Sequence, residues 1–283
     1  MRMGRGIGRA ERCSLVDLAS SHVIITGGSS GIGLATARLL AGRGARLSLI
    51  ARGGSGLDVA AAELRGCGAS VAVARADVAD RAALGAAVAG LVAHHGPCDV
   101  LITCAGATRP GYFLDLPEEA FRQMMEVNYF GTLYAVREVA PGMVQRRRGS
   151  VVAVSSAAGL LGVFGYSAYG PAKFAVRGLM ESVRAELTPY GVHVGVVFPP
   201  DVDTPMLAEE VLSRPAETNA VSGTVGPIGA EVVAAAIVSG IDRRTFTICP
   251  DRSTWALARL GSLLVPVLNR HFDRKVSALR SLG

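Results

Sequence analysis

Tyr169 and Lys173 are the pair of side chains whose types and spacing most clearly permit catalysis. They stand four positions apart in Tyr169-Gly170-Pro171-Ala172-Lys173, so a helix that begins there places them on one face. Pro171 suits the first turn of such a helix. A nearby ammonium and the positive helix end favour the phenolate and lower the pKa of Tyr169. We therefore expect Tyr169 to donate a proton to a developing alkoxide, or to act as the base in the reverse direction.

Two further polar residues strengthen this interpretation, because a lone Tyr-x-x-x-Lys spacing is far more often a surface pair. Ser156 ends an apolar run thirteen positions before Tyr169, and its hydroxyl can hydrogen-bond a carbonyl oxygen held between it and the phenol. Asn128 lies within an expected long helix. A buried amide there either satisfies a backbone group of the core or holds a water beside the lysine.

A glycine-rich turn follows the first expected strand and reads Thr26-Gly27-Gly28-Ser29-Ser30-Gly31-Ile32-Gly33. Glycines let the backbone turn tightly and approach a pyrophosphate, which then lies on the N-terminus of the next helix. The strand before the turn and the helix after it make this a dinucleotide-binding motif. The residues that we expect to contact the cofactor here are Gly27, Ser29, Ser30, Gly31, Ile32 and Gly33.

The end of the second expected strand bears on the choice between NAD and NADP. The segment Leu49-Ile50-Ala51-Arg52 has no acid to bind a ribose 2′-hydroxyl, and Arg52 can bind a 2′-phosphate. The cofactor expected is therefore NADPH, although Arg52 can also be a plain surface residue. Asp77 and Val78, after the third strand, are placed to meet the adenine.

Strand-like apolar runs alternate with helical patterns along the chain. We expect strands at 23–26, 46–51, 70–75, 100–104, 151–155, 193–198 and 245–249, with helices ending near 41 and covering 57–65, 81–94, 118–147, 169–189 and 230–240. This order predicts an α/β fold of the Rossmann type, a doubly wound parallel sheet of about seven strands in three layers. Ligands of such sheets bind beyond the carboxyl ends of the strands, where the motifs above fall.

Charge divides the chain into three parts. The formal net charge is +6, of which residues 1–12 carry +3 and residues 252–283 carry +5, which leaves −2 for the rest. We expect a basic tail over 1–20, one catalytic domain over 21–250 with a lid at about 204–228, and a C-terminal extension over 251–283. Solvated ends explain the charge most simply, and no basic stretch is interleaved with aromatics as nucleic-acid binding would need. The five cysteines are scattered, which favours a reducing compartment, and no metal site is expected.

Taken together, these motifs resemble the short-chain dehydrogenase/reductase superfamily over about residues 21–250. The match adds the segment Cys104-Ala105-Gly106 to the glycine turn, Asp77, Asn128, Ser156, Tyr169 and Lys173. The resemblance implies hydride transfer at a nicotinamide, a Ser-Tyr-Lys site, a proton relay through Asn128, and contacts from Cys104, Ala105, Gly106, Tyr169 and Lys173 to the cofactor. It also places Pro199, Val202 and Thr204 at the nicotinamide carboxamide. The departures from the family pattern are Thr103, expected to hydrogen-bond across strands, the residues Gly170-Pro171-Ala172 between the tyrosine and the lysine, and Pro200.

Within that superfamily the segment Phe198-Pro199-Pro200-Asp201-Val202-Asp203-Thr204-Pro205 is similar to the 3-ketodihydrosphingosine reductases. So are segments 22–30, 160–166, 173–179 and 214–218. The resemblance implies NADPH-dependent reduction of 3-ketosphinganine to sphinganine in sphingolipid biosynthesis. A 3-oxoacyl thioester reductase or a hydroxysteroid dehydrogenase is an alternative within the fold. A non-catalytic NADPH-binding sensor or scaffold is an alternative of another class.

A lipid-like ketone needs an apolar site, and two segments offer one. Val163 and Phe164 follow Ser156, and the lid carries Met206, Leu207, Val211 and Leu212. The stretch 255–268 is shorter than the ~20 residues of a spanning helix, so it predicts at most peripheral membrane contact or a subunit contact. We expect a cytoplasmic protein, in contact at most with the cytoplasmic membrane face. The superfamily implies a homo-oligomer, a dimer or tetramer that pairs helices 118–147 and 169–189.

Overall fold

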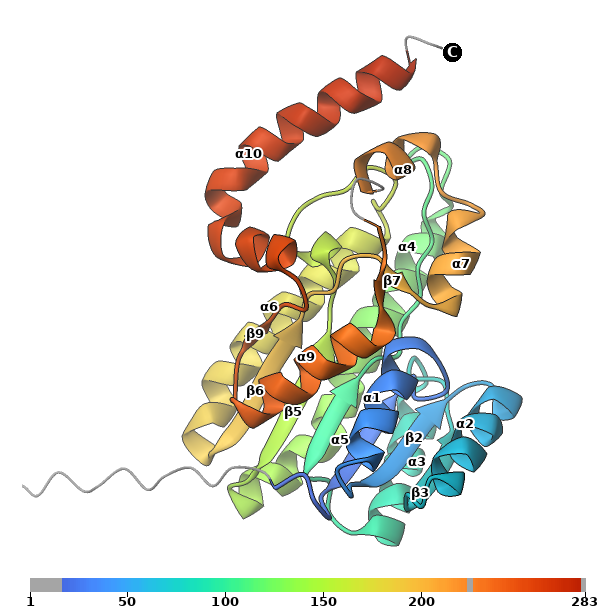
Figure 1. Ribbon diagram of the computed structural model, residues 1–283, viewed down its shortest axis with the longest axis vertical. Helices are drawn as coiled ribbons and strands as arrows, with labels where there is room; N and C mark the ends of the chain where they lie inside the picture. The colour runs from blue at the N-terminus through green and yellow to red at the C-terminus, as the bar shows by residue number, and fades with distance from the viewer. Residues whose placement is uncertain (1–16, 223–225, 281–283) are drawn as a thin grey trace, which may run out of the picture.

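The computed structural model describes residues 17–222 and 226–280, so most of the expected N-terminal tail lies outside the described residues. A seven-stranded parallel sheet in the order β3-β2-β1-β4-β5-β6-β9 forms its centre (Figure 1). The expected doubly wound sheet is thereby confirmed. The strands are β1 (His22–Thr26), β2 (Arg46–Ala51), β3 (Val71–Arg75), β4 (Val100–Thr103), β5 (Gly149–Val154), β6 (Val192–Val197) and β9 (Thr247–Ile248).

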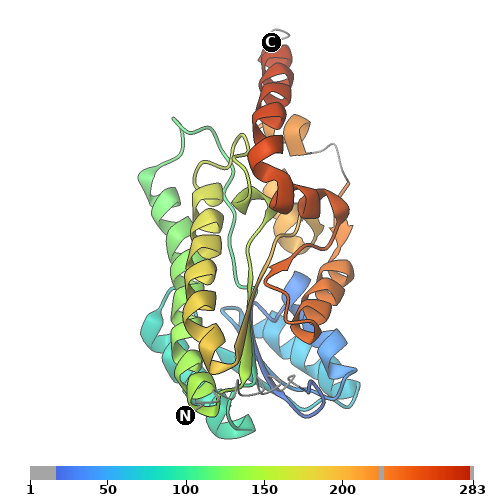
Figure 2. The same cartoon turned by 90° about the vertical axis from the view of Figure 1, so that its left-hand side faces the viewer.

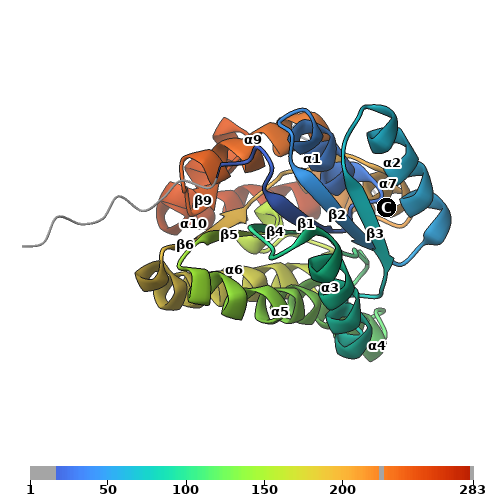
Figure 3. The same ribbon diagram turned by 90° about the horizontal axis from the view of Figure 1, so that it is seen from below.

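Helices cover both faces of the sheet, as seen from below in Figure 3. One layer holds α1 (Gly31–Ala41), α2 (Gly54–Gly66) and α9 (Ala230–Asp242), and the other holds α3 (Arg81–His95), α5 (Gly131–Arg146) and α6 (Tyr169–Leu187). Alternate strand residues feed the two cores, since Val23 and Ile25 pack into the first and Ile24 into the second. Apolar strands buried on both faces therefore explain the three layers.

The long helix expected at 118–147 is interrupted. It divides into α4 (Glu118–Met124), a π-helix (Met125–Phe130) and α5. The Asn128 side chain lies in this π-helix, and its Nδ2 donates to the Met124 carbonyl oxygen at 3.0 Å. Such π-helical turns inside α-helices occur frequently at functional sites. The single-helix expectation was wrong at this point.

The expected lid segment folds into short elements above the carboxyl edge of the sheet. It contains α7 (Pro205–Val211) and α8 (Ala216–Ser222), and residues 223–225 lie outside the described residues. A two-stranded parallel pair of β7 (Val202–Asp203) with β8 (Ile228–Gly229) joins the two ends of the segment. Thr204 begins α7, because its hydroxyl accepts a hydrogen bond from the Leu207 N–H at 3.3 Å.

The C-terminal helix α10 (Arg252–Arg280) is much longer than the apolar stretch 255–268. Asp251 caps it, since Oδ1 accepts from the Ser253 and Thr254 N–H groups at 2.8 and 3.0 Å. The helix changes direction and extends past the body of the molecule (Figures 1 and 2), and Pro266 lies inside it. Within the described residues, no helix combines the length and apolarity needed to cross a bilayer.

Candidate active site

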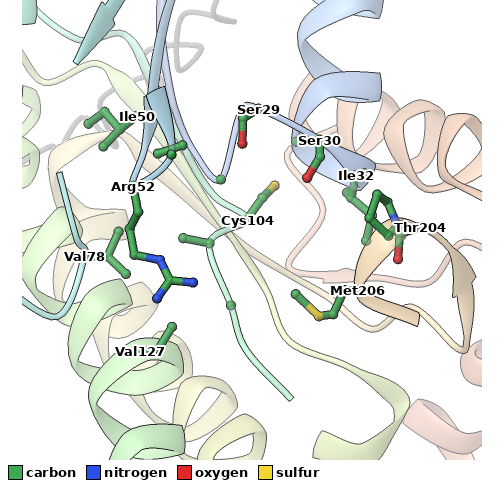
Figure 4. Close-up of a pocket in the computed structure, with 18 of the residues that line it drawn as sticks. Ser29, Ser30, Ile32, Ile50, Arg52, Val78, Cys104, Val127, Thr204 and Met206 are labelled. Carbon is green, nitrogen blue, oxygen red and sulfur yellow. The ribbon is translucent and has the colours of Figure 1, made fainter. Parts of the chain in front are cut away.

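Two adjoining pockets open at the carboxyl edge of the sheet. The first has a volume of about 270 Å³, and Figure 4 shows the Arg52 guanidinium reaching into it opposite Thr204 and Met206. Thirteen of the expected cofactor-binding residues line this pocket, namely Gly27, Ser29, Ser30, Gly31, Ile32, Gly33, Arg52, Asp77, Val78, Cys104, Ala105, Gly106 and Thr204. These residues come from five separate segments of the chain, which meet because parallel strands end on the same side of the sheet.

The glycine turn after β1 is shaped by contacts that leave no space for side chains. Gly27 has a φ of +70°, and a Cβ there would lie 2.7 Å from the Ala105 nitrogen. A Cβ on Gly33 would collide with the Gly27 carbonyl oxygen. Ser30 is the N-cap residue of α1, but its side chain makes no capping hydrogen bond to the first turn of that helix. The N–H groups of that turn therefore face the pocket beside a close-packed backbone, which fits a pyrophosphate.

Arg52 meets Asp77 across the far end of the first pocket. Its Nη1 lies 4.0 Å from the Asp77 Oδ2, and the two side chains are 64% and 42% exposed. An ion pair this long and this exposed contributes little. The Asp77 Oδ1 also accepts from the Ala79 N–H at 3.0 Å, which fixes the carboxylate. The guanidinium is therefore able to bind an anionic group that enters the pocket.

The second pocket, of about 110 Å³, brings the expected catalytic residues together. Ser156, Tyr169, Lys173 and Asn128 line it, with Pro199 and Val202. The buried Lys173 ammonium donates to the Val154 carbonyl oxygen at 3.1 Å and lies 5.6 Å from the centroid of the Tyr169 ring. Ser156 is close enough to the Tyr169 phenol for hydrogen bonding to oppose the rise in its pKa. The two pockets share Ile32, Cys104, Gly106, Thr204 and Met206, so they form one continuous site.

Burial changes the acid–base character of the pair. Desolvation raises the pKa of Tyr169 above its usual value, against the smaller lowering by the Ser156 hydrogen bond. Desolvation also lowers the pKa of Lys173 to about 8. The expectation that the ammonium and the helix end lower the pKa of Tyr169 was therefore wrong for this structure, because desolvation is the larger effect. The phenol keeps its proton at neutral pH, which suits a proton donor.

Asn128 is buried, and its side-chain amide forms hydrogen bonds with backbone groups. Its Nδ2 donates to the Ala107 carbonyl oxygen at 3.0 Å, and its Oδ1 accepts from the Ala107 N–H at 3.3 Å. Asn128 was expected either to satisfy a backbone group of the core or to hold a water beside the lysine. The structure shows its hydrogen bonds to core backbone groups. Thr103 differs from expectation, since its buried hydroxyl has no hydrogen-bond partner among residues 17–222 and 226–280. The predicted bond across strands was wrong.

Known proteins that are similar to this chain indicate its family. The family model described as short chain dehydrogenase matches residues 21–214. A 3-ketodihydrosphingosine reductase of Dictyostelium discoideum is 38% identical over 90% of this chain and 82% of its own length. A 3-dehydrosphinganine reductase of Danio rerio is 38% identical over 88% of this chain and 77% of its own length. The chain belongs to the short-chain dehydrogenase family.

Solved structures support the same placement of this short-chain dehydrogenase. A short chain dehydrogenase/reductase from Burkholderia phymatum in complex with NAD is 25% identical, with a TM-score of 0.80 over 89% of this chain and 96% of its own. An actinorhodin polyketide ketoreductase variant with NADPH is 29% identical, with a TM-score of 0.74 over 82% of this chain and 96% of its own. In both comparisons the likeness covers more than four fifths of this chain.

Sequence reasoning missed a buried polar network in this short-chain dehydrogenase. The Arg214 guanidinium donates to Glu210 at 2.5 Å and to both carboxylate oxygens of Asp201 at 2.8 and 3.1 Å. The Tyr166 hydroxyl donates to Glu210, and its ring lies 5.4 Å from that of Tyr169. The network joins the lid to the turn after β6. The sequence shows charged residues at Asp201 and in the lid at Glu210 and Arg214. That these residues pair with one another depends on the fold, so the sequence did not predict the network.

The apolar residues expected in the lid are divided. Met206 and Leu207 line the second pocket. Val211 and Leu212 are exposed on the outer side of the lid, so the cleft expected from them was wrong. The two exposed residues lie at the end of α7, directly after the buried network residue Glu210. The apolar wall of the site must therefore come from other elements.

Proposed function

We propose that this short-chain dehydrogenase uses NADPH to reduce a long-chain ketone, 3-ketosphinganine, to sphinganine in sphingolipid biosynthesis. The observation that carries the proposal is the meeting of Ser156, Tyr169 and Lys173 in a pocket continuous with the glycine-lined pocket. The names of the relatives at 38% identity support the substrate. A nicotinamide cofactor, when bound, supplies the hydride.

Each residue of the site has a proposed task. The glycine turn and α1 would hold the pyrophosphate, and Arg52 would hold the 2′-phosphate that distinguishes NADPH. Pro199, Val202 and Thr204 would meet the nicotinamide end, and Lys173 its ribose. Ser156 would hydrogen-bond the substrate carbonyl oxygen. Tyr169 would give its phenolic proton to that oxygen as negative charge develops there.

The proton affinity of Tyr169 supports reduction as the working direction. A phenol whose pKa lies above its ordinary value is protonated at neutral pH, and a ketone needs an acid at this position. Oxidation of the alcohol needs the phenolate instead. Arg52 supports the same direction, since NADPH is the cofactor used for reduction.

Contacts with a second copy and with a membrane surface form part of the proposal. Helices α5 and α6 lie side by side on one face of the molecule (Figure 2), and α6 carries the exposed aromatic residue Phe174. This face would pair in a homo-oligomer. The start of α10 exposes Trp255 beside the basic residues Arg252 and Arg259, which suits peripheral contact with anionic lipid at the cytoplasmic membrane face. Light scattering and vesicle flotation test the two contacts.

A substrate comparison tests the proposed reaction. Purified protein is given NADPH with 3-ketosphinganine, a 3-oxoacyl thioester or a 3-ketosteroid, and the loss of absorbance of NADPH is followed. We expect the largest kcat/KM with 3-ketosphinganine and sphinganine as the product. Turnover of the thioester without turnover of 3-ketosphinganine would make the substrate assignment wrong. Binding of NADPH without reduction of any ketone would favour a sensor instead.

A further inference from the structure

A third cavity of about 340 Å³ lies directly beside the catalytic pocket. It shares Ser156, Tyr166, Pro200 and Asp201 with that pocket, so the two are continuous. Its polar lining is confined to this shared end and to the capped start of α10. Away from them the walls are formed by aliphatic and aromatic side chains. Such a gradient suits a molecule with one polar reacting end and one apolar chain.

One side of α10 forms the outer wall of the cavity. Leu257, Leu264, Leu268 and Phe272 line it, at spacings of seven, four and four residues, which places them on one face of a helix. From Leu257 to Phe272 the helix path is about 22 Å long at its ordinary rise. The cavity is about three times as large as the catalytic pocket of about 110 Å³. The wall is therefore extended enough to follow a long alkyl chain.

The neighbouring residues of α10 point the other way. Leu263 is 73% exposed and Val267 is 65% exposed, whereas Leu264 and Leu268 line the cavity. Leu264 and Leu268 thus each have an exposed aliphatic neighbour one position before them. The same substitution can therefore be made at a cavity-facing position and at its exposed neighbour in the same turn of the helix.

Other elements hold the helix over the cavity. The Lys275 ammonium donates to the Ala220 carbonyl oxygen of α8 at 3.1 Å, and Asp251 caps the first turn. Val221 of α8 and Leu161 and Val163 of the loop after Ser156 complete the apolar walls. The cavity is thus built by the C-terminal extension, the lid and the catalytic loop together.

We propose that this cavity binds the hydrocarbon chain of the ketone, and that Leu264 and Leu268 of α10 set the chain length that the enzyme prefers. The proposal rests on the proposed function and extends it. The chain enters from the carbonyl held at Ser156 and Tyr169 and passes Pro200 toward Phe272. Each methylene that leaves water in such a site tightens binding by about fourfold, so a long chain gains strongly over a short one.

Matched tryptophan substitutions test the proposal. Leu264→Trp fills the cavity, whereas Leu263→Trp adds the same bulk on the outer face. Reduction of 3-ketosphinganine analogues with chains of eight and eighteen carbons is compared. We expect Leu264→Trp to lower kcat/KM at least tenfold for the long analogue and less than twofold for the short one, and Leu263→Trp to leave both unchanged. Equal effects of the two variants, or equal effects on both chain lengths, would overturn the proposal.

A binding measurement separates this proposal from the proposed reaction. The fluorescent probe is dansyl-labelled undecanoic acid, titrated into wild type, Leu268→Trp and Val267→Trp, whose folding is checked by circular dichroism and thermal unfolding. We expect Leu268→Trp to weaken binding at least tenfold relative to Val267→Trp. This result would hold even if no ketone were reduced, in which case only the reaction would be wrong. Equal binding by both variants contradicts the cavity assignment, whatever the activity.

Discussion

The Lys173 ammonium lies 5.6 Å from the centre of the Tyr169 ring and is held there by a 3.1 Å hydrogen bond to the Val154 carbonyl oxygen. Near pH 7 the pair therefore combines a mostly charged ammonium with a phenol that keeps its proton. The strand β5 supplies the anchor and the first turn of α6 supplies both side chains. The pair therefore depends on the packing of β5 against α6 as well as on its own spacing.

The pKa of Lys173 predicts a pH dependence for ketone reduction. Desolvation lowers that pKa to about 8, so the side chain is charged below pH 8 and neutral above it. The charged ammonium orients the site and favours proton transfer from Tyr169. Loss of this charge therefore slows the reduction. We expect kcat/KM for reduction to fall about tenfold for each pH unit above that value. The pKa of Tyr169 is raised, so its own ionisation does not produce this limb.

Lys173→Met is the matched variant for that profile. It should show low kcat/KM at every pH and no limb near pH 8, because the titrating group is absent. A limb that persists unchanged in Lys173→Met would assign the pH dependence to another group.

Arg52 should determine the preference for NADPH. Removing a charged hydrogen-bond donor costs about 1.5–3 kcal/mol, which corresponds to roughly a tenfold to hundredfold weaker interaction. We expect Arg52→Ala to raise the KM for NADPH by at least about tenfold and to change the KM for NADH less than twofold. Arg38→Ala is the control, since Arg38 is an exposed arginine that pairs with Glu63 away from the pocket. Equal changes for both cofactors would remove Arg52 from the 2′-phosphate site.

The buried arginine of the lid should stabilise the protein far more than an exposed one. Arg214 is 4% exposed and pairs with the buried Glu210 and the partly exposed Asp201, so Arg214→Met leaves both carboxylates without their cation. Breaking such a pair costs about 3–5 kcal/mol. We expect a loss of this order in urea unfolding, together with faster proteolysis of the lid. Arg177→Met removes an exposed pair with Glu181 and should cost less than about 1 kcal/mol. Equal losses would mean that the network does not hold the lid.

Local sequence patterns predicted the strands and the first pocket well. Runs such as Leu47–Ile50 are buried on both faces, and buried parallel strands are continuous apolar runs. The glycine turn was readable because Gly27 and Gly33 lie where any side chain collides with backbone. Each of these features depends on a few neighbouring residues and on the shared edge of the sheet.

Features that depend on distant partners were not predicted. The bond from Arg214 to Asp201 requires the lid to fold back over the turn after β6. The π-helix around Asn128 depends on how its amide competes for the Met124 carbonyl oxygen. The pKa of Tyr169 depends on the desolvation that packing produces, which spacing in the sequence does not reveal.

The most direct test of the account compares wild type with Tyr169→Phe in the reduction of 3-ketosphinganine by NADPH. The phenylalanine keeps the ring and removes only the hydroxyl, so binding of NADPH and thermal stability should stay close to those of wild type. We expect wild type to form sphinganine and the variant to lose at least about a hundredfold in kcat, which is the order that proton transfer by a positioned side chain contributes. Turnover by Tyr169→Phe near the wild-type rate would show that the Tyr169 phenol does not donate the proton.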